Sequence, residues 1–389
     1  QESYYVNTVD MILDLTGTIL QIITLFLIPN YIIYLIINVA KNILANMIIS
    51  VDCGRRYKNY LKKPQNPIVD SYKKPIKDYV KDVFVSKIGG YVFSGTDNII
   101  ISVFMGSLLA GYLTNYTMIS TGIKGIITQV LSSVQATYGN YIVIEKNKKK
   151  QCSMTDNYIY IDYMIGNICM ICGIMLFQPF IDILYGSKFL LPQSTAVLVS
   201  VNLGLAILLI IPSQIFVVFK LYRYDKIVVC IAAILNILIS IGLVIVIGIN
   251  GVLIGTTIAS LIYLFFRFYI MAKKVFEIEY SHYIKKFLIY AGISFLNIII
   301  VFFLSKRIDI NGWMDWILYA LMVTGLSIVI SFICTSKTAE YDYFVTKIIP
   351  GGRRVYKIVI MFLGMGALGV FIMFYFRDNA SANAQLSLL

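Results

Sequence analysis

The sequence predicts an all-α protein that crosses a membrane many times, and three observations carry this prediction. Of the 389 residues, 59% are hydrophobic and 14% are charged, whereas soluble domains average roughly 45–50% apolar and about 25% charged residues. Apolar runs of about 20 residues recur along the whole chain, and each is long enough to cross a hydrocarbon layer. The runs are continuous rather than alternating, which favours helices over the strands of an outer-membrane barrel.

Eleven apolar runs, separated by polar breaks, predict eleven transmembrane helices. They cover residues 11–27, 31–51, 83–105, 108–130, 158–177, 196–219, 227–247, 252–270, 287–304, 316–334 and 355–376. Pro212 predicts a kink in its helix, because proline lacks the N–H that a helix interior uses. Asn202, Ser213 and Gln214 are candidates to bond the backbone groups that the kink frees. The GxxxG spacing of Gly251 and Gly255 predicts close packing against a neighbouring helix.

Basic residues are distributed unequally between the connections and predict the orientation. The 33 Lys and Arg against 20 Asp and Glu give a formal net charge of +13, and cytoplasmic loops collect such an excess. Most of it lies in the connections 52–82, 146–150, 220–226, 273–286 and 337–357. The intervening connections hold only Lys188, Lys306 and Arg307. We therefore expect the basic connections to be cytoplasmic. We also expect their positive charge to interact with membrane lipids rather than with nucleic acid.

The longest polar interruption divides the chain. Residues 52–82 contain Pro64, Pro67 and Pro75 and predict a basic cytoplasmic linker. It separates two helices in residues 1–51 from six helices in residues 83–271. Trailing helices follow in residues 272–376, and a polar tail occupies residues 377–389.

The Cys and His residues give no support for metal or cofactor chemistry. The six cysteines are scattered and the only histidine is His282, so no metal-ligand spacing arises and we expect no metal, no cofactor and no catalytic residue. Cys169 and Cys172 form a CxxC inside an apolar run. A redox or zinc pair needs a polar, accessible setting, so this pair predicts helix packing.

Five charged residues inside the expected spans are candidate site residues: Lys41, Lys87, Asp97, Lys124 and Arg267. A charge at mid-membrane costs roughly 2.5–3.5 kcal/mol, so each needs a partner or a water-filled cavity. Four of the five are positive, which favours an anionic solute. Lys87 and Arg267 lie near helix ends, where snorkelling to the interface is an equal explanation. Asp97 either neutralises a lysine or contacts substrate or a cation.

Polar side chains follow helical spacing on three of the expected spans. The stripes are Lys87, Tyr91, Ser94, Asn98 and Ser102; Thr117, Ser120, Lys124 and Thr128; and Thr256, Ser260, Tyr263 and Arg267. Hydroxyl and amide side chains also serve helix packing in membranes. Lys124 lies about six residues from its helix end, further than the one turn that a snorkelling stem covers, so a cavity-lining role is expected for it.

Two further stretches have a distinctive pattern. The first runs from Ser94 through Asp97, Asn98 and Ser102 to the segment 111–116, which includes Asn115. The second is the segment 248–260, with Gly251 and Gly255. Both resemble segments of polysaccharide repeat-unit flippases, the Wzx-like members of the multidrug/oligosaccharidyl-lipid/polysaccharide export superfamily. The resemblance extends over nearly the whole chain, to about residue 347.

This resemblance implies two six-helix lobes around a central cavity. Residues 11–27 and 31–51 correspond to the fifth and sixth family helices, so we expect four more helices upstream of a chain that starts without Met. The implied activity is alternating-access translocation of undecaprenyl-pyrophosphate-linked oligosaccharide across the bacterial cytoplasmic membrane for surface polysaccharide such as O-antigen or capsule, with other polysaccharide-assembly membrane proteins as possible partners. The expected substrate-binding residues are Lys124, Lys41, Lys87, Arg267, Asn98 and Asn115, with Asp97 for ion coupling or charge pairing.

Two other functions stay open. An ion-coupled multidrug exporter of the same superfamily would use acidic cavity residues for cationic drugs, and Asp97 is the one candidate for this. A membrane polysaccharide polymerase, ligase or acyltransferase would need a catalytic constellation. The chain has no large outer loop and no His or Arg cluster of that kind, so we expect a transporter rather than an enzyme.

Overall fold

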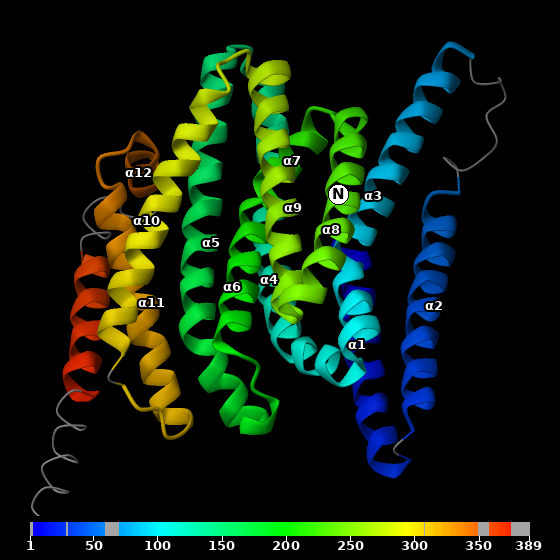
Figure 1. Cartoon of the computed structure of the whole chain (residues 1–389). Helices are drawn as coiled ribbons and strands as arrows, with labels where there is room; N and C mark the ends of the chain where they lie inside the picture. Colours follow the sequence, from blue (N-terminus) through cyan, green and yellow to red (C-terminus); the bar gives the residue numbers. More distant parts are fainter. Residues whose placement is uncertain (1–2, 29, 59–69, 307, 349–357, 375–389) are drawn as a thin grey trace, which may run out of the picture. The chain divides into compact units, whose positions relative to one another are not determined.

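The computed structural model describes residues 3–28, 30–58, 70–306, 308–348 and 358–374, and within them it contains helices and no strand. The helices are α1 (Ser3–Leu27), α2 (Tyr31–Arg56), α3 (Asp70–Met105), α4 (Ser107–Ile144), α5 (Lys148–Tyr185), α6 (Gln193–Leu208), α7 (Ile210–Val218), α8 (Tyr222–Ile247), α9 (Ile249–Ile270), α10 (Ser281–Ser305), α11 (Trp313–Thr335) and α12 (Ala339–Tyr343) (Figure 1). The described segments also contain a short 3-10 helix, Ser187–Phe189, and two short π-helices, Met271–Phe276 and Phe344–Ile348. A further apolar helix covers Ile358–Phe374. The predicted all-α class is confirmed.

The described helices include nine that are long and apolar enough to cross a membrane. They are Thr8–Leu27, Tyr31–Arg56, Lys73–Met105, Lys148–Tyr185, Gln193–Val218, Tyr222–Ile247, Ile249–Phe276, Ser281–Ser305 and Trp313–Thr335. The chain is therefore a multi-pass membrane protein by helix length and hydropathy.

Two of the eleven expected spans differ from this set. The expected span 108–130 lies in α4, which has 38 residues but is not apolar enough to be counted. Its polar residues, Lys124 among them, lower its mean hydropathy. The expected span 355–376 extends past the described residues at both ends, and the described part, Ile358–Phe374, is an apolar helix.

The chain divides into two compact units, Gln1–Ile76 and Lys77–Leu389. The division falls inside the predicted linker 52–82, whose two ends are helical, since α2 continues to Arg56 and α3 begins at Asp70. The middle of this linker and the predicted polar tail 377–389 lie outside the described residues.

In the first unit, α1 and α2 form an antiparallel pair. Asn30 caps α2, because its side-chain oxygen accepts a hydrogen bond of 2.8 Å from the Ile32 N–H. Lys41 Nζ lies 2.8 Å from Asp14 Oδ1 and joins the two helices. A Cβ atom on Gly17 would come within 2.8 Å of the Lys41 stem, so the absence of a side chain on Gly17 makes room for the lysine.

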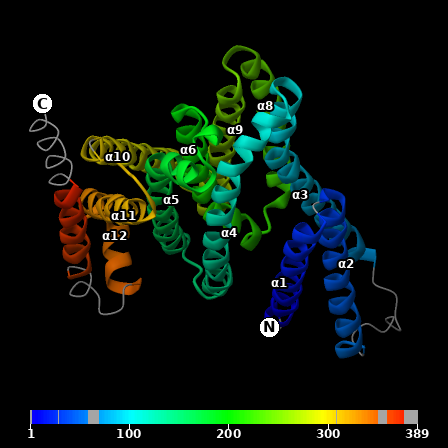
Figure 2. The same ribbon diagram turned by 90° about the horizontal axis from the view of Figure 1, so that it is seen from below.

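In the second unit, α8 and α9 lie side by side, and α10 and α11 pack beside α5 (Figures 1 and 2). The chain reverses between α8 and α9 at Gly248, whose positive φ of 61° suits glycine. Cβ atoms on Gly251 and Gly255 would lie less than 3.0 Å from atoms of Leu243 and Ser240 on α8. The close helix approach predicted from the GxxxG spacing is confirmed.

The predicted kink at Pro212 is also confirmed. One apolar span, Gln193–Val218, is broken at Leu209 into α6 and α7. The proline ring leaves the Leu208 carbonyl without its usual intrahelical N–H donor. The Asp162 carboxylate on α5 accepts a hydrogen bond of 3.0 Å from the Ile211 N–H in the first turn of α7. An acidic side chain there also complements the positive end of the helix dipole.

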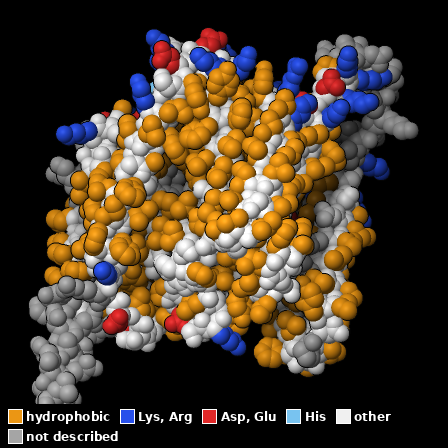
Figure 3. All heavy atoms as spheres, viewed as in Figure 1, with side chains coloured by type: hydrophobic (Ala, Val, Ile, Leu, Met, Phe, Trp, Pro, Cys, Tyr) orange, Lys and Arg blue, Asp and Glu red, His pale blue; other side chains and the backbone are white. Residues whose placement is uncertain are grey.

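Lys and Arg side chains of the second unit gather at the end of the bundle where α4 meets α5, while hydrophobic side chains cover the flanks below (Figure 3). Asn147 caps α5 at this turn, accepting from the Lys149 N–H at 3.0 Å. Glu145 accepts from the Asn147 N–H at 2.9 Å, and this bond lowers the pKa of Glu145. The polar turn is thus organised by its own side chains, as befits a connection outside the hydrocarbon layer.

Candidate functional site

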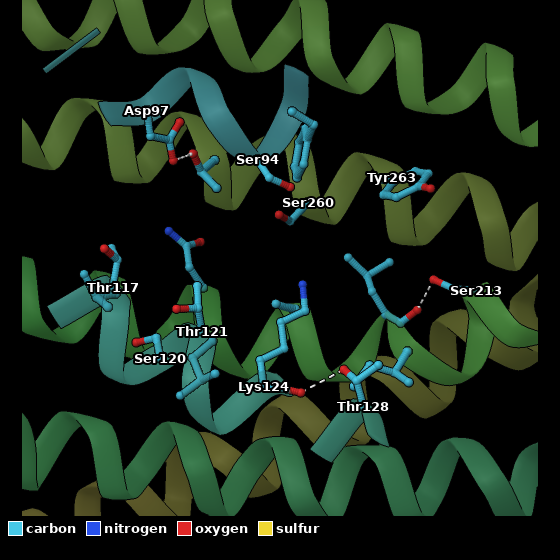
Figure 4. A pocket seen from close by; sticks show the side chains of 18 of the residues that line it. Ser94, Asp97, Thr117, Ser120, Thr121, Lys124, Thr128, Ser213, Ser260 and Tyr263 are labelled. Carbon is cyan, nitrogen blue, oxygen red and sulfur yellow. Dashed lines mark hydrogen bonds between the residues drawn. The ribbon is translucent and has the colours of Figure 1, made fainter. Parts of the chain in front are cut away.

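A cavity of about 520 Å³ lies among five helix segments of the second unit (Figure 4). Its walls come from α3, α4, α6, α7 and α9, with Leu209 at the α6–α7 break. The volume falls in the range of about 300–1,000 Å³ that is typical of ligand sites. The lining is mixed: apolar residues such as Val199, Leu203 and Leu253 alternate with hydroxyl, amide and charged side chains. A polar-lined cavity in a bundle of apolar helices is the feature that sets this region apart.

The α4 wall carries the predicted stripe. Thr117, Ser120, Lys124 and Thr128 all line the cavity, as three- and four-residue helical steps require. The Ser120 and Thr128 hydroxyls donate to the carbonyls of Tyr116 and Lys124, at 3.1 Å and 2.8 Å. Their oxygens remain able to accept bonds from a ligand or water.

Lys124 projects from this wall toward α3 and α9 (Figure 4). In the described part of the chain, no carboxylate lies within ion-pairing distance of its ammonium. A charged group in such a place needs water or an anionic ligand around it. The cavity therefore presents one uncompensated positive side chain.

The opposite wall holds Asp97, which α3 positions beside α8 and α9. The Thr256 hydroxyl donates to Asp97 Oδ2 at 2.7 Å, and Asn236 Nδ2 donates to Oδ1 at 3.4 Å. Asn236 is fully buried, and its side-chain oxygen accepts from Ser240 at 3.1 Å. In the described residues Asp97 is thus held by neutral hydrogen-bond donors and forms no ion pair with a lysine.

A buried ion pair lies behind one wall of the cavity. Arg267 Nη2 lies 2.7 Å from Asp225 Oδ1, and both side chains are almost completely buried. Tyr263 donates to the same Asp225 oxygen at 3.1 Å, and Ser86 donates to the other at 2.5 Å. Arg267 also contacts Ser213 and stacks over the Tyr263 ring at 4.1 Å. Since Tyr263 and Ser213 line the cavity, the ion pair supports its wall from behind.

This arrangement resolves the snorkelling alternative for Arg267. A snorkelling arginine has its guanidinium in water or headgroups, whereas this guanidinium is buried against Asp225 and two aromatic rings. Lys87 lines an adjacent hollow of about 330 Å³, together with Arg267 and Asp225. This hollow shares Phe93, Ser213 and Tyr263 with the larger cavity.

The remaining candidate residues lie elsewhere. Lys41 pairs with Asp14 in the first unit. Asn98 is exposed and Asn115 is half-buried, and neither is among the residues that line the 520 Å³ cavity. The structure thus brings Lys124 and Asp97 together with the hydroxyl residues, and leaves the other five candidates outside this cavity.

The sequence-based tally of four positive charges and one negative charge was incomplete. Asp14 and Asp162 also lie inside the expected spans, and Asp225 lies just before one. Each of these carboxylates has a tertiary partner, which is Lys41 for Asp14, the Ile211 N–H for Asp162, and Arg267 for Asp225. These carboxylates reduce the positive excess predicted for the membrane interior, and Lys124 is the cationic residue that lines the cavity.

The ligand types available in this cavity are few. Among the described residues that line it, Asp97 is the one carboxylate and none is Cys or His. Cys169 and Cys172 are free thiols on α5, and Cys172 Sγ contacts the Thr324 hydroxyl at 3.3 Å, as the packing interpretation expects.

No family model, no curated protein and no solved structure matches this chain. The fold and the cavity define the class: a multi-pass, all-α membrane protein with a polar cavity inside one helical unit.

Proposed function

We propose that this protein is a transporter that carries lipid-linked oligosaccharides across the bacterial cytoplasmic membrane. One observation carries the proposal, namely the ammonium of Lys124 in a hydroxyl-lined cavity among membrane helices, without an ion pair in the described residues. Lysine is a common point-charge ligand for phosphate. Hydroxyl and amide side chains such as Thr117, Ser120 and Asn202 suit the hydroxyl groups of sugars.

The proposed mechanism assigns a role to each of these groups. Lys124 binds the pyrophosphate that links the lipid to the sugars, the hydroxyl residues bind the sugars, and the polyprenyl chain stays in the bilayer. The break between α6 and α7 borders the cavity at Leu209 and Ile210. Broken helices at binding sites are common in transporters that work by alternating access. The resemblance to repeat-unit flippases supports the same function.

A second function, ion-coupled drug export, is favoured by Asp97. Its carboxylate faces the same cavity and accepts hydrogen bonds from Thr256 and Asn236. A carboxylate beside hydroxyl and amide groups is a ligand set for a proton or a hard cation. We rank this function second, because Lys124 on the opposite wall repels a cationic drug.

The test is reconstitution of the whole protein in liposomes that contain a fluorescent undecaprenyl-pyrophosphate-linked oligosaccharide. We expect Lys124→Ala to slow translocation about 10- to 150-fold, because one charge-assisted contact contributes roughly 1.5–3 kcal/mol. Lys124→Arg should retain part of the activity. Lys149→Ala, at the exposed start of α5, is the matched control and should behave as wild type. If Lys124→Ala transports as fast as wild type when equal amounts of protein are reconstituted, Lys124 does not bind the substrate and the proposal loses its main support.

A further inference from the structure

A second group of polar side chains lies away from the cavity, where α5 and α10 begin. The Cys152 thiol, a carboxylate oxygen of Asp156 and an imidazole nitrogen of His282 lie within 4.8 Å of one another. Cys152 and Asp156 are one helical turn apart on α5, so they share a face. His282 stands in the first turn of α10, and its Nε2 is 2.9 Å from Asp156 Oδ2. Residues 130 positions apart in sequence thus converge.

The carboxylate of Asp156 is only partly satisfied. Its Oδ2 lies 2.9 Å from His282 Nε2 and 2.7 Å from the ammonium nitrogen of Lys286. Its Oδ1 is buried and has no hydrogen-bond partner in the structure, while the residue as a whole is 6% exposed. A buried carboxylate oxygen without a partner is costly. An additional ligand on this oxygen would therefore lower the free energy of the folded state.

The donor set matches a borderline-soft divalent ion. Thiolate, imidazole and carboxylate are the three ligand types that zinc uses, at about 2.0–2.3 Å. Tetrahedral bonds of that length place neighbouring donor atoms about 3.3–3.8 Å apart. The donors here are already within 4.8 Å of one another, so small side-chain rotations bring them to bonding distance. Three protein ligands leave the fourth position for water.

The charges around the group also favour a divalent cation. Lys286 bridges Asp156 and Glu340, which brings α12 into the same cluster. With a thiolate at Cys152, the three acidic groups and Lys286 sum to −2, which a divalent ion neutralises. The Lys286 ammonium lies 2.7 Å from Asp156 Oδ2 and repels a cation that approaches this carboxylate, so removing the ammonium should strengthen metal binding.

The group is accessible from water. Asp156 lies eight residues from the start of α5, or about 12 Å along a helix of 38 residues that is itself about 57 Å long. A hydrocarbon layer of roughly 30 Å leaves such a helix projecting at its ends. The side chain of His282 is 37% exposed and offers the route by which an ion enters.

We propose that Cys152, Asp156 and His282 form a binding site for a divalent transition-metal ion, with zinc as the preferred ion. The site is independent of the proposed transport function. Its ligands come from α5 and α10, so metal binding would link α10, the first of the trailing helices, to the helices that surround the cavity. A metal there would add to the Lys286–Asp156 ion pair, which already joins the two helices, and would make the junction more rigid.

The test is cobalt titration of the purified whole protein, because a thiolate bound to Co²⁺ gives a charge-transfer absorption in the near ultraviolet. We expect this band, with displacement by zinc. Cys152→Ser should abolish the band, and His282→Gln should weaken binding at least about tenfold, since even outer-shell changes cost 10- to 100-fold. Cys334→Ser, an exposed cysteine on α11, is the matched control and should keep the band.

Lys286→Met supplies the discriminating variant. Removal of the repelling ammonium should tighten cobalt binding if Asp156 is a ligand, whereas a purely structural ion-pair cluster predicts no cobalt binding in either protein. Zinc should also raise the melting temperature of the wild type and of Cys334→Ser but not of Cys152→Ser. Absence of the band in wild type, or its persistence in Cys152→Ser, would overturn the proposal. Loss of transport in Lys124→Ala bears only on the proposed function.

Discussion

Lys124 on α4 and Asp97 on α3 line the same cavity, yet no ion pair joins them. Asp97 takes its hydrogen bonds from Thr256 and Asn236 instead. Opposite charges that face one cavity without contact leave both groups available to a ligand. This relationship determines what substitutions at the two positions should do.

The first prediction separates the roles of these two residues. If they do not neutralise each other, Asp97→Asn should not be rescued by Lys124→Gln, and the double variant should transport no better than the worse single variant. Translocation in liposomes, with and without an ion gradient, measures this. Recovery of activity in the double variant would show that the two charges pair during the transport cycle. A change in gradient dependence for Asp97→Asn alone would favour the ion-coupled function.

The second prediction concerns the buried Arg267–Asp225 pair. Asp225→Ala should destabilise the protein by about 3–5 kcal/mol, because it leaves a buried guanidinium without its counter-charge. The double variant Asp225→Ala, Arg267→Met should recover much of the loss. Thermal unfolding in detergent gives the comparison.

A matched control for that pair exists in the same protein. Lys148 and Glu277 form an ion pair of 2.6 Å whose side chains are 47% and 67% exposed. Lys148→Ala should change stability by at most about 1 kcal/mol, because exposed pairs contribute little. Equal effects of Lys148→Ala and Asp225→Ala would contradict the role assigned to burial.

The third prediction concerns Asp162, the carboxylate that bonds the start of α7. Asp162→Asn should retain near-wild-type stability, because an amide oxygen can still accept from the Ile211 N–H. Asp162→Leu should lose about 1–2 kcal/mol, since a buried N–H in the first turn of a helix is left without an acceptor. Melting temperatures of the two variants decide between them. A leucine variant as stable as the asparagine variant would show that the broken helix needs no cap.

The fourth prediction is the orientation. Starting from a cysteine-free protein, Lys149→Cys should react with a membrane-impermeant maleimide only after the cells are opened, and Ser187→Cys should react in intact cells. The reason is that Lys and Arg accumulate in cytoplasmic connections, and Lys149 belongs to the basic α4–α5 turn. The reverse labelling pattern would invert the orientation and the side from which the cavity is loaded.

The sequence predicted features that depend on local spacing. The apolar runs predicted the helices, and Pro212 predicted the break between α6 and α7. The spacing of Gly251 and Gly255 predicted the close approach of α9 to α8. The polar stripe from Thr117 to Thr128 gave one wall of the cavity. Each of these follows from residues within two or three helical turns, where the geometry of a single helix fixes which side chains share a face.

Only the tertiary structure decided which charges meet. Asp225 and Arg267 are 42 positions apart, and Cys152 and His282 are 130 apart. Helical spacing places a residue on a face of its own helix but leaves the neighbouring helix undetermined. Whether a buried charge faces a counter-charge, a helix end or an open cavity depends on that neighbour, because in a low-dielectric interior the nearest polar group dominates its energy. For this reason Arg267, a candidate ligand by sequence, belongs to the supporting wall, and Lys124 remains the positive group that faces the cavity.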